Sequence, residues 1–217
     1  MGALIMANAK PTKSKSVKPA RKLAKATRLE RRAVVRKLLE NRGDMLVVCG
    51  LGSSTYDVFA AGDDDRNIYL WGAMGGAAMI GLGLAIAQPR KPVLVITGDG
   101  EQLMGLGALA TIGAQAPKNL AIVVLDNAHY AETGMQQSHT ARGVSMTAVA
   151  AGCGFTWTGD IDSMAGLGTI RDHLERRAGP ALATVRIEAS EPPRALPLRD
   201  GVEMKNRFRR ALGLQTI

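Results

Sequence analysis

Short, continuous apolar runs alternate with segments of helical length along most of this 217-residue chain. Such runs are typical of strands that are covered on both faces of a sheet. Two-residue hairpin turns such as Asn-Gly do not separate neighbouring runs, so each strand is predicted to connect to the next through a helix. Strands that alternate with helices form parallel sheets, and we therefore expect an α/β protein, a three-layer αβα sandwich around a parallel sheet.

The predicted elements follow from the positions of these runs. Strands are expected over residues 45–49, 92–97, 120–125 and 181–187. Helices are expected over residues 27–42, 74–88, 102–115, 163–177 and 201–212. In the first helix, one face would carry Leu29, Ala33, Val34, Leu38 and Leu39.

Basic residues are concentrated at the start of the chain, and this explains the net charge of +9. Residues 1–42 hold 13 Lys or Arg against Glu30 and Glu40, whereas the rest holds 15 basic and 17 acidic side chains. We expect a disordered basic tail over residues 1–27 and one domain over residues 28–217. A transit-like leader is an alternative, and so is a nucleic-acid-binding arm, although the tail offers no aromatic residue for base stacking.

The two cysteines, Cys49 and Cys153, form neither a disulfide framework nor a metal-ligand spacing. This usage favours a reducing compartment, and we expect a cytoplasmic protein. The apolar runs are shorter than the about 20 residues of a membrane-spanning helix. The sequence therefore argues against a disulfide-stapled secreted protein, a structural zinc site and a membrane-spanning protein.

Ligands of a parallel sheet bind beyond the carboxyl ends of its strands, so the turns that follow the strands are the candidate sites. Three turns stand out: Gly50-Leu51-Gly52-Ser53-Ser54, Gly98-Asp99-Gly100 and Asp126-Asn127-Ala128-His129. Glycines admit close approach of the backbone to a ligand, and free amides at a helix start attract an anion. The Asp99 carboxylate would repel a phosphate unless a divalent cation such as Mg²⁺ joined the two.

Asn127 supports such a metal site. It lies 28 positions after Asp99, and one predicted helix and one predicted strand separate the two residues. Adjacent parallel strands would bring both turns to one edge, where Asn127 and the backbone carbonyl of His129 would add oxygen ligands for Mg²⁺. Taken alone, Gly-Asp-Gly is better explained as a plain turn in which Asp99 caps a helix.

Gly98-Asp99-Gly100, followed after 26 residues by Asn127, resembles the thiamine diphosphate signature of 2-oxo-acid decarboxylases and acetolactate-synthase-like enzymes. The family pattern ends in Asn-Asn, whereas this chain has Asn127-Ala128. The segment Trp71-Gly72-Ala73-Met74-Gly75 also resembles the stretch that precedes the signature helix in that family. The resemblance covers about residues 44–190 and implies the thiamine diphosphate-binding fold called the PP domain, with thiamine diphosphate and Mg²⁺ as cofactors.

The resemblance also implies roles for individual residues. Metal ligands would be Asp99, Asn127 and the His129 carbonyl, the Gly72 carbonyl would bind the aminopyrimidine, and Met74 would support the bent cofactor. Without the family, Met74 would be interpreted as a core residue. Further cofactor contacts are implied for Gly52, Ser53, Ser54, Ala73, Gly98, Gly100, Glu101, Tyr130 and Ala131.

Enzymes of this family combine a PP domain with a Pyr domain, whose Glu activates the cofactor. The sequence contains the PP pattern alone, so the resemblance implies a separate Pyr-domain subunit as partner. Glu101 and Glu132 are the carboxylates of this chain closest to the motifs, but both are expected on the metal side of the site.

Residues 125–136, together with Ser138-His139-Thr140, resemble the β subunits of sulfopyruvate decarboxylases and the related phosphonopyruvate decarboxylases. This implies that an anionic 3-substituted pyruvate is converted to an aldehyde and CO₂. Candidate catalytic or substrate-binding residues are His129, Glu132, His139 and Arg142, of which His139 could merely hold the loop and Arg142 could be a solvated charge.

Two other functions stay open. One is an acetolactate-synthase-like carboligation, in which a second carbonyl compound replaces the proton. The other is a non-catalytic nucleotide- or flavin-binding module, against which the Asp99 and Asn127 pair argues. Gly81-x-Gly83 could begin the Gly-x-Gly-x-x-Gly fingerprint of a dinucleotide-binding site. That fingerprint would need a third glycine at position 86, where this chain has Ile86.

Overall fold

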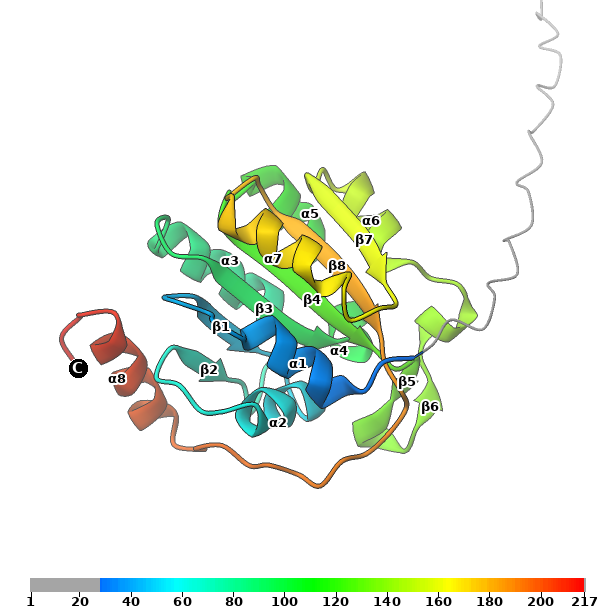
Figure 1. Cartoon of the computed structure of the whole chain (residues 1–217), viewed down its shortest axis with the longest axis horizontal. Helices are drawn as coiled ribbons and strands as arrows, with labels where there is room; N and C mark the ends of the chain where they lie inside the picture. Colours follow the sequence, from blue (N-terminus) through cyan, green and yellow to red (C-terminus); the bar gives the residue numbers. More distant parts are fainter. Residues whose placement is uncertain (1–27, 217) are drawn as a thin grey trace, which may run out of the picture.

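The computed structural model describes residues 28–216 as a parallel six-stranded sheet between two layers of helices (Figure 1). The strand order is β2-β1-β3-β4-β8-β7. The strands are β1 (Leu46–Cys49), β2 (Asn67–Tyr69), β3 (Val93–Gly98), β4 (Leu120–Asp126), β7 (Trp157–Ile161) and β8 (Ala181–Arg186). This confirms the predicted αβα class, whereas the predicted tail over residues 1–27 lies outside the described residues.

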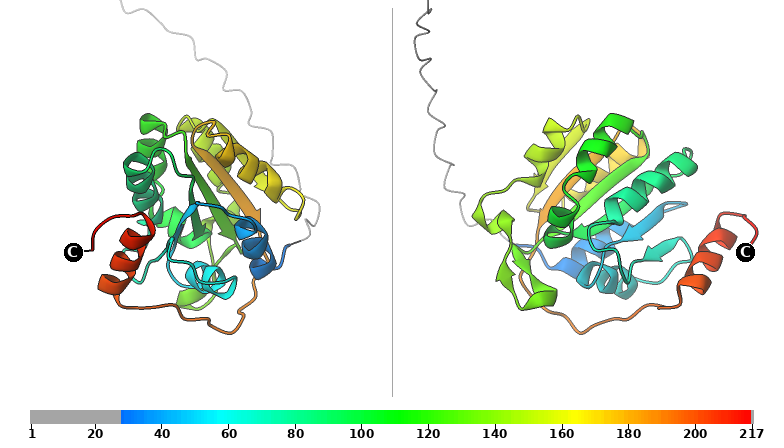
Figure 2. Two further views of the ribbon diagram at one scale, coloured as in Figure 1. Left: turned by 60° about the vertical axis from the view of Figure 1, so that its left-hand side comes forward. Right: turned by 180° about the vertical axis from the view of Figure 1, so that it is seen from behind.

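Helices cover both faces of the sheet (Figure 2). One face carries α1 (Arg31–Leu39), α2 (Ser53–Ala60) and α7 (Leu167–Glu175). The other carries α3 (Ala77–Ala87), α5 (Ala108–Gln115) and α6 (Met146–Gly152). The short helix α4 (Asp99–Met104) follows β3 directly, and a small antiparallel pair, β5 (His129–Tyr130) and β6 (Gln136–Gln137), lies in the loop after β4.

The core is divided between the two faces according to the alternation of side chains along each strand. In β1, Val47 and Cys49 pack in the cluster under α1 and α7, whereas Leu46 and Val48 pack in the cluster under α3 and α5. Every residue of β1 and β4 is buried, which explains why these strands appear in the sequence as continuous apolar runs.

The first helix begins at Arg31 rather than near residue 27. Leu29 forms a β-bridge with Ile187, and its amide donates to the Arg186 carbonyl at 3.0 Å, so the chain enters the helix in an extended conformation. The buried face of α1 consists of Arg31, Val34, Val35 and Leu38, and the predicted face was therefore partly wrong.

The helix predicted over residues 102–115 is in fact two helices, α4 and α5. The break lies at Gly105, whose backbone packs against that of Gly75. A Cβ atom at Gly105 would lie 2.1 Å from the Gly75 carbonyl oxygen, so the position requires glycine.

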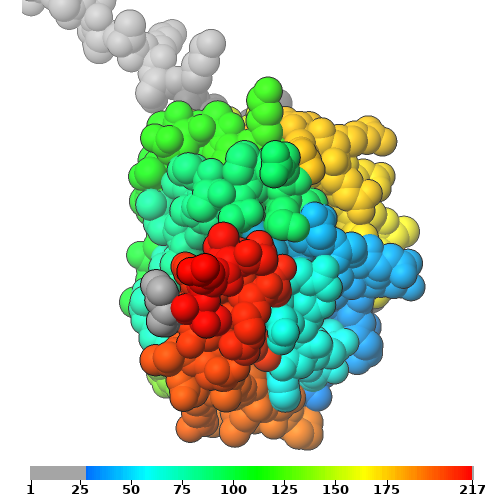
Figure 3. Space-filling model, turned by 90° about the vertical axis from the view of Figure 1, so that its left-hand side faces the viewer, coloured from blue at the N-terminus to red at the C-terminus, as the bar shows by residue number. Residues whose placement is uncertain are grey.

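A C-terminal connector, residues 188–200, leads from β8 to α8 (Gly201–Ala211), which lies over the β2 edge of the sheet (Figures 1 and 3). Met204 packs in the core cluster of one face and Phe208 in that of the other. The Tyr69 amide of β2 donates to the sulfur of Met204 at 3.2 Å. The helix thus straddles the edge of the sheet.

Both cysteines are free, Cys49 in the core and Cys153 partly buried. Across residues 28–216, each helix is too short or too polar to cross a lipid bilayer.

Candidate functional site

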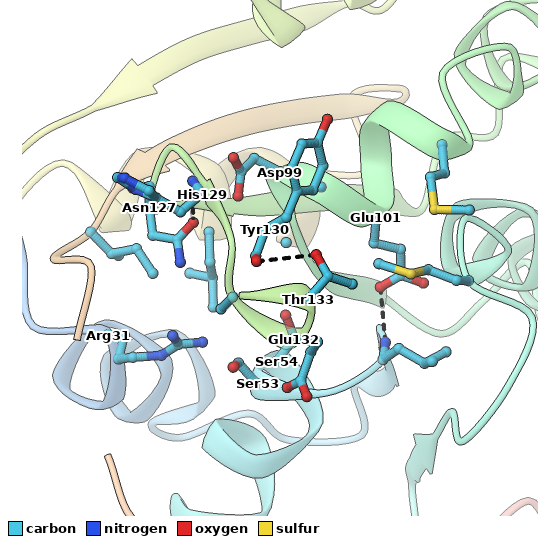
Figure 4. A pocket seen from close by; sticks show the side chains of 18 residues that line it. Arg31, Ser53, Ser54, Asp99, Glu101, Asn127, His129, Tyr130, Glu132 and Thr133 are labelled. Carbon is cyan, nitrogen blue, oxygen red and sulfur yellow. Dashed lines mark hydrogen bonds between the residues drawn. The ribbon is translucent and has the colours of Figure 1, made fainter. Parts of the chain in front are cut away.

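The candidate site is a cavity of about 160 Å³ at the carboxyl edge of the sheet, beyond the ends of β1, β3 and β4 (Figure 4). The predicted residues that line it are Ser53, Ser54, Met74, Gly98, Asp99, Gly100, Glu101, Asn127, His129, Tyr130, Ala131 and Glu132. Among the described residues that the sequence also singled out, Gly52, Gly72, Ala73, His139 and Arg142 do not line it.

Asp99 and Asn127 leave adjacent strands at the same edge. The register of β3 and β4 pairs Gly98 with Leu125, so the residues that follow each strand come close together. Asp99 is the first residue of α4, and its side chain is as fully buried as that of Asn127. The adjacency that the spacing predicts is therefore confirmed.

Two hydroxyl groups lie close to the Asp99 carboxylate. Its Oδ2 accepts a hydrogen bond from Ser138 Oγ at 2.5 Å and lies 3.2 Å from Thr140 Oγ1, whose single hydrogen has a closer acceptor in Asp126 Oδ1 at 2.7 Å. Burial raises the pKa of Asp99 to about 6, and the charge of Asp126 adds to the rise, while the Ser138 hydroxyl opposes it. A bound cation would offset the free-energy cost of keeping Asp99 charged in this buried position beside Asp126.

Asn127 organises the turn after β4. Its Oδ1 accepts from the His129 amide at 2.8 Å, and its backbone carbonyl accepts from Arg28 at 3.1 Å. The same carbonyl lies 2.8 Å from His129 Nδ1, which must be the protonated nitrogen because a carbonyl can only accept. The His129 ring is thereby folded back on the turn.

Ala128 occupies the left-handed region of backbone conformation, with φ of 64°. A side chain with a Cβ atom disfavours this region, and Asn tolerates it better than Ala. The chain therefore departs from the Asn-Asn pattern at Ala128, a position where the backbone favours Asn over Ala.

The helix α2 begins at Ser53 without a capping side chain, and its first two residues, Ser53 and Ser54, line the cavity. Gly52 precedes it with φ of 66°, and a Cβ atom there would lie 2.5 Å from the Glu132 carboxylate. Gly52 does not line the cavity itself. Because it has no side chain, Glu132 can approach the start of α2.

Glu101 is buried, and its carboxylate links the end of β3 to the turn that follows β1. Its Oε2 accepts from the Leu51 amide and from the Thr97 hydroxyl, both at 2.9 Å. Burial raises the pKa of Glu101, and the hydrogen bonds from Thr97 and Leu51 oppose the rise. The backbone amides of Gly75 and Ala77 also oppose the rise in the pKa of this carboxyl.

Two methionines, Met74 and Met104, line the cavity although 41% and 64% of their surfaces are exposed. Large apolar side chains that are exposed beside a cavity are typical of a surface that another molecule covers.

His139 and Arg142 lie on the 3₁₀ turn His139–Arg142, outside the cavity. The Tyr130 hydroxyl and His139 Nδ1 are 2.6 Å apart, and their rings meet edge to face. His139 thus holds Tyr130, while Arg142 is exposed.

Sequence reasoning assigned no site role to several residues in or around the cavity, among them Arg31, Met104, Asp126, Ser138 and Thr140. Asp126 was detectable as a carboxylate that ends an apolar run. Arg31 was detectable as a charged residue on the helix face that carries Val34 and Leu38. Ser138 and Thr140 belong to a motif that resembles the family, but nothing in the sequence indicated that their hydroxyls approach Asp99 from a loop about 40 positions away.

Comparisons with known proteins identify similar chains. The phosphonopyruvate decarboxylase of Streptomyces viridochromogenes is 45% identical over 138 residues, which cover 64% of this chain and 34% of that protein. The sulfopyruvate decarboxylase subunit beta of Methanocaldococcus jannaschii is 42% identical over 122 residues, which cover 56% of this chain and 64% of that subunit. The chain therefore spans from a third to somewhat less than two thirds of these relatives.

A solved structure, benzoylformate decarboxylase from Polynucleobacter necessarius, shares the fold with a TM-score of 0.61 at 20% identity, over 83% of this chain and 36% of that one. The family model of the thiamine pyrophosphate enzyme, C-terminal TPP binding domain, matches residues 55–182, which contain Asp99 and Asn127. With this match over more than half of its length, the chain belongs to the family of thiamine pyrophosphate enzymes and carries their TPP-binding domain.

Proposed function

We propose that this chain is the diphosphate- and Mg²⁺-binding subunit of a decarboxylase that converts an anionic 3-substituted pyruvate to the aldehyde and CO₂. The observation that carries the proposal is the meeting of Asp99 and Asn127 at the ends of β3 and β4, inside the cavity of a TPP-binding domain. Residues 28–217 would form the PP domain.

The residues present fit the cofactor and its metal. Asp99 is a buried carboxylate whose charge is costly without a cation, and carboxylate and amide oxygens are ligands that Mg²⁺ prefers.

Individual roles follow from these positions. Asp99, Asn127 and the His129 carbonyl would hold Mg²⁺, and the amides at the start of α2, near Ser53 and Ser54, would bind diphosphate oxygens. Bound thiamine diphosphate supplies the electron sink that the loss of CO₂ from a 2-oxo acid requires. Met74 and Met104 would exclude water beside it.

A separate Pyr-domain subunit would complete the site. The cavity of about 160 Å³ is smaller than the roughly 300–1,000 Å³ of typical cofactor pockets. Glu101 is engaged by Leu51 and Thr97, so it is poorly placed to activate the cofactor. The exposed Met74 and Met104 offer the partner an apolar contact.

The substrate assignment draws on two relatives, whose names specify sulfopyruvate and phosphonopyruvate. We place 3-sulfopyruvate first and 3-phosphonopyruvate second. Both have a 2-oxo acid at one end and a tetrahedral oxyanion at the other, so they require the same kind of donors.

The test is reconstitution. The purified chain with thiamine diphosphate and Mg²⁺ is expected to be nearly inactive on both substrates, and a co-purified partner from the native host is expected to restore aldehyde formation, measured by aldehyde trapping. Decarboxylation by the chain alone would contradict the split site. A carboligation product in place of the aldehyde would favour the acetolactate-synthase-like alternative.

A further inference from the structure

A second cavity, of about 210 Å³, lies beside the first. The two cavities share Arg31, Ser53, Ala131 and Glu132 as lining residues. The second cavity is enclosed by α1, α2, the loop after β5 and the C-terminal connector, residues 188–200. A ligand in the first cavity is therefore within reach of the second.

Arg31 is the residue that joins the two cavities. It is the first residue of α1 and is 97% buried, since its relative exposure is 3%. Its Nε lies 2.5 Å from Oδ2 of the buried Asp57, and its Nη1 lies 3.5 Å from the Ser190 carbonyl. This ion pair compensates the burial of the guanidinium and fixes its orientation. Figure 4 shows the side chain extending from α1 toward Ser53.

Two further arginines line the second cavity. Arg32 lies 3.4 Å from Oδ1 of Asp57 and donates to the Pro193 carbonyl of the connector. Arg194 of the connector lines the cavity with a side chain that is 69% exposed, and its guanidinium lies 5.9 Å from the centre of the Tyr56 ring. Three guanidinium groups thus surround one cavity from two directions.

The acidic groups around this cavity leave room for an anion. Asp57 is occupied by Arg31 and Arg32. Glu132 is 39% exposed and lies 3.8 Å from Arg194, an ion pair too long and too solvated to be strong. Glu191 is exposed. An entering anion would displace Glu132 from Arg194 toward solvent.

We propose that the second cavity binds the sulfonate or phosphonate group of the substrate, with Arg31 and Arg194 as its ligands. The proposal rests on the function proposed above. Guanidinium groups match tetrahedral oxyanions with paired, charge-assisted hydrogen bonds. His139 and Arg142, which the sequence suggested for this role, line neither cavity among the described residues.

The experiment measures anion binding directly, without turnover. The full chain is saturated with thiamine diphosphate and Mg²⁺, so that the diphosphate site is filled. Methanesulfonate, methylphosphonate and, as a carboxylate control, acetate are then titrated, and their methyl signals are followed by ligand-observed NMR. The two oxyanion arms show which group the cavity prefers.

Variants locate the site. Arg194→Gln is expected to weaken binding of the preferred oxyanion about tenfold, because one charge-assisted contact is lost. Arg31→Lys keeps the charge opposite Asp57 but loses the planar fork, and a similar loss is expected. Arg36→Gln is the matched control, because Arg36 is an exposed arginine on the same helix that lines neither cavity.

Two results would overturn the proposal: no binding of either oxyanion to the cofactor-loaded chain, or unchanged binding in Arg194→Gln. Oxyanion binding as expected, in an assembled protein that forms no aldehyde, would instead refute the proposed function and leave the anion site intact. If Arg31→Lys does not fold, Arg194→Gln alone decides.

Discussion

Ser138 Oγ donates a 2.5 Å hydrogen bond to Asp99 Oδ2, although the two residues are 39 positions apart and Ser138 is fully buried. The loop after β4 therefore holds a carboxylate that follows β3. This contact stabilises the charged form of Asp99 against burial and the charge of Asp126.

Replacement of Ser138 by Ala should raise the pKa of Asp99 further, because a donor to the charged form is lost. Protons would then compete with Mg²⁺ at a higher pH, and stability should fall by about 1–3 kcal/mol. Mg²⁺ titrations between pH 5 and pH 8 should show the shift. Ser138→Thr should restore the wild-type profile, and an unchanged profile in Ser138→Ala would count against the contact.

Loss of the metal ligand should be more severe. Asp99→Ala is expected to weaken Mg²⁺-dependent binding of thiamine diphosphate by about 100-fold or more, beyond the effect of a typical supporting residue. Calorimetry with and without EDTA provides the measurement, and Asp162→Ala, an exposed Asp, is the control. Equal cofactor affinity of wild type and Asp99→Ala in Mg²⁺ would refute the metal role.

Whereas Asp99→Ala should weaken cofactor binding, Asp99→Asn should raise the free energy of unfolding of the metal-free chain. Because burial raises the pKa of Asp99 to about 6 from 3.8, the folded chain binds a proton between these pH values that the unfolded chain does not bind. This group therefore favours folding as the pH falls from 7 to 4. Asp99→Asn should stabilise the metal-free chain by about 1–3 kcal/mol at pH 7.

Most of that gain should disappear at pH 4, where the folded wild type already carries the proton. Urea unfolding of both proteins at the two pH values provides the comparison. A stability difference that is the same at both would mean that Asp99 is not the titrating group.

Ala128→Gly should stabilise the chain by about 0.5–1 kcal/mol, because it removes the cost of a Cβ atom at positive φ. Ala110→Gly, at an exposed position inside α5, is the matched control and should destabilise by a similar amount. Urea unfolding should show a higher free energy of unfolding for Ala128→Gly and a lower one for Ala110→Gly. A destabilised Ala128→Gly would mean that the turn is not strained.

Removal of residues 1–26 should leave turnover of the assembled enzyme within a factor of a few. Residues 1–26 carry seven Lys or Arg and no acidic residue, whereas the residues that line the two cavities all lie at position 31 or later. The measurement is aldehyde formation with and without residues 1–26. A large loss of turnover in a folded variant would place this segment in the site or at the subunit interface.

The strands that the sequence predicted are those buried on both faces. β1, β3, β4 and β8 lie inside the sheet, where most positions are buried and apolar. β2 and β7 lie at its edges, and β7 contains Gly159 and Asp160, which interrupt an apolar run. Their strand character comes from pairing with β1 and β8 rather than from local composition.

The residues of the site also differ in how far the sequence alone could predict them. Asp99 and Asn127 were predictable, because the ends of neighbouring parallel strands must meet. Arg31 was detectable as a charge on the apolar face of the first predicted helix, but its role was not, because its partner Asp57 lies 26 positions away on a helix that was not predicted. Residues that act through such distant pairs leave no periodic signal in the sequence.

Because α8 straddles the edge of the sheet at β2, it also determines how the protein behaves in concentrated solution. An open edge strand is a template on which another chain can add a strand. With Met204 against the Tyr69 amide, that edge is closed to strand addition. A chain that ended before Gly201 would keep its cofactor cavity but expose β2, so aggregation rather than loss of chemistry would be its first defect.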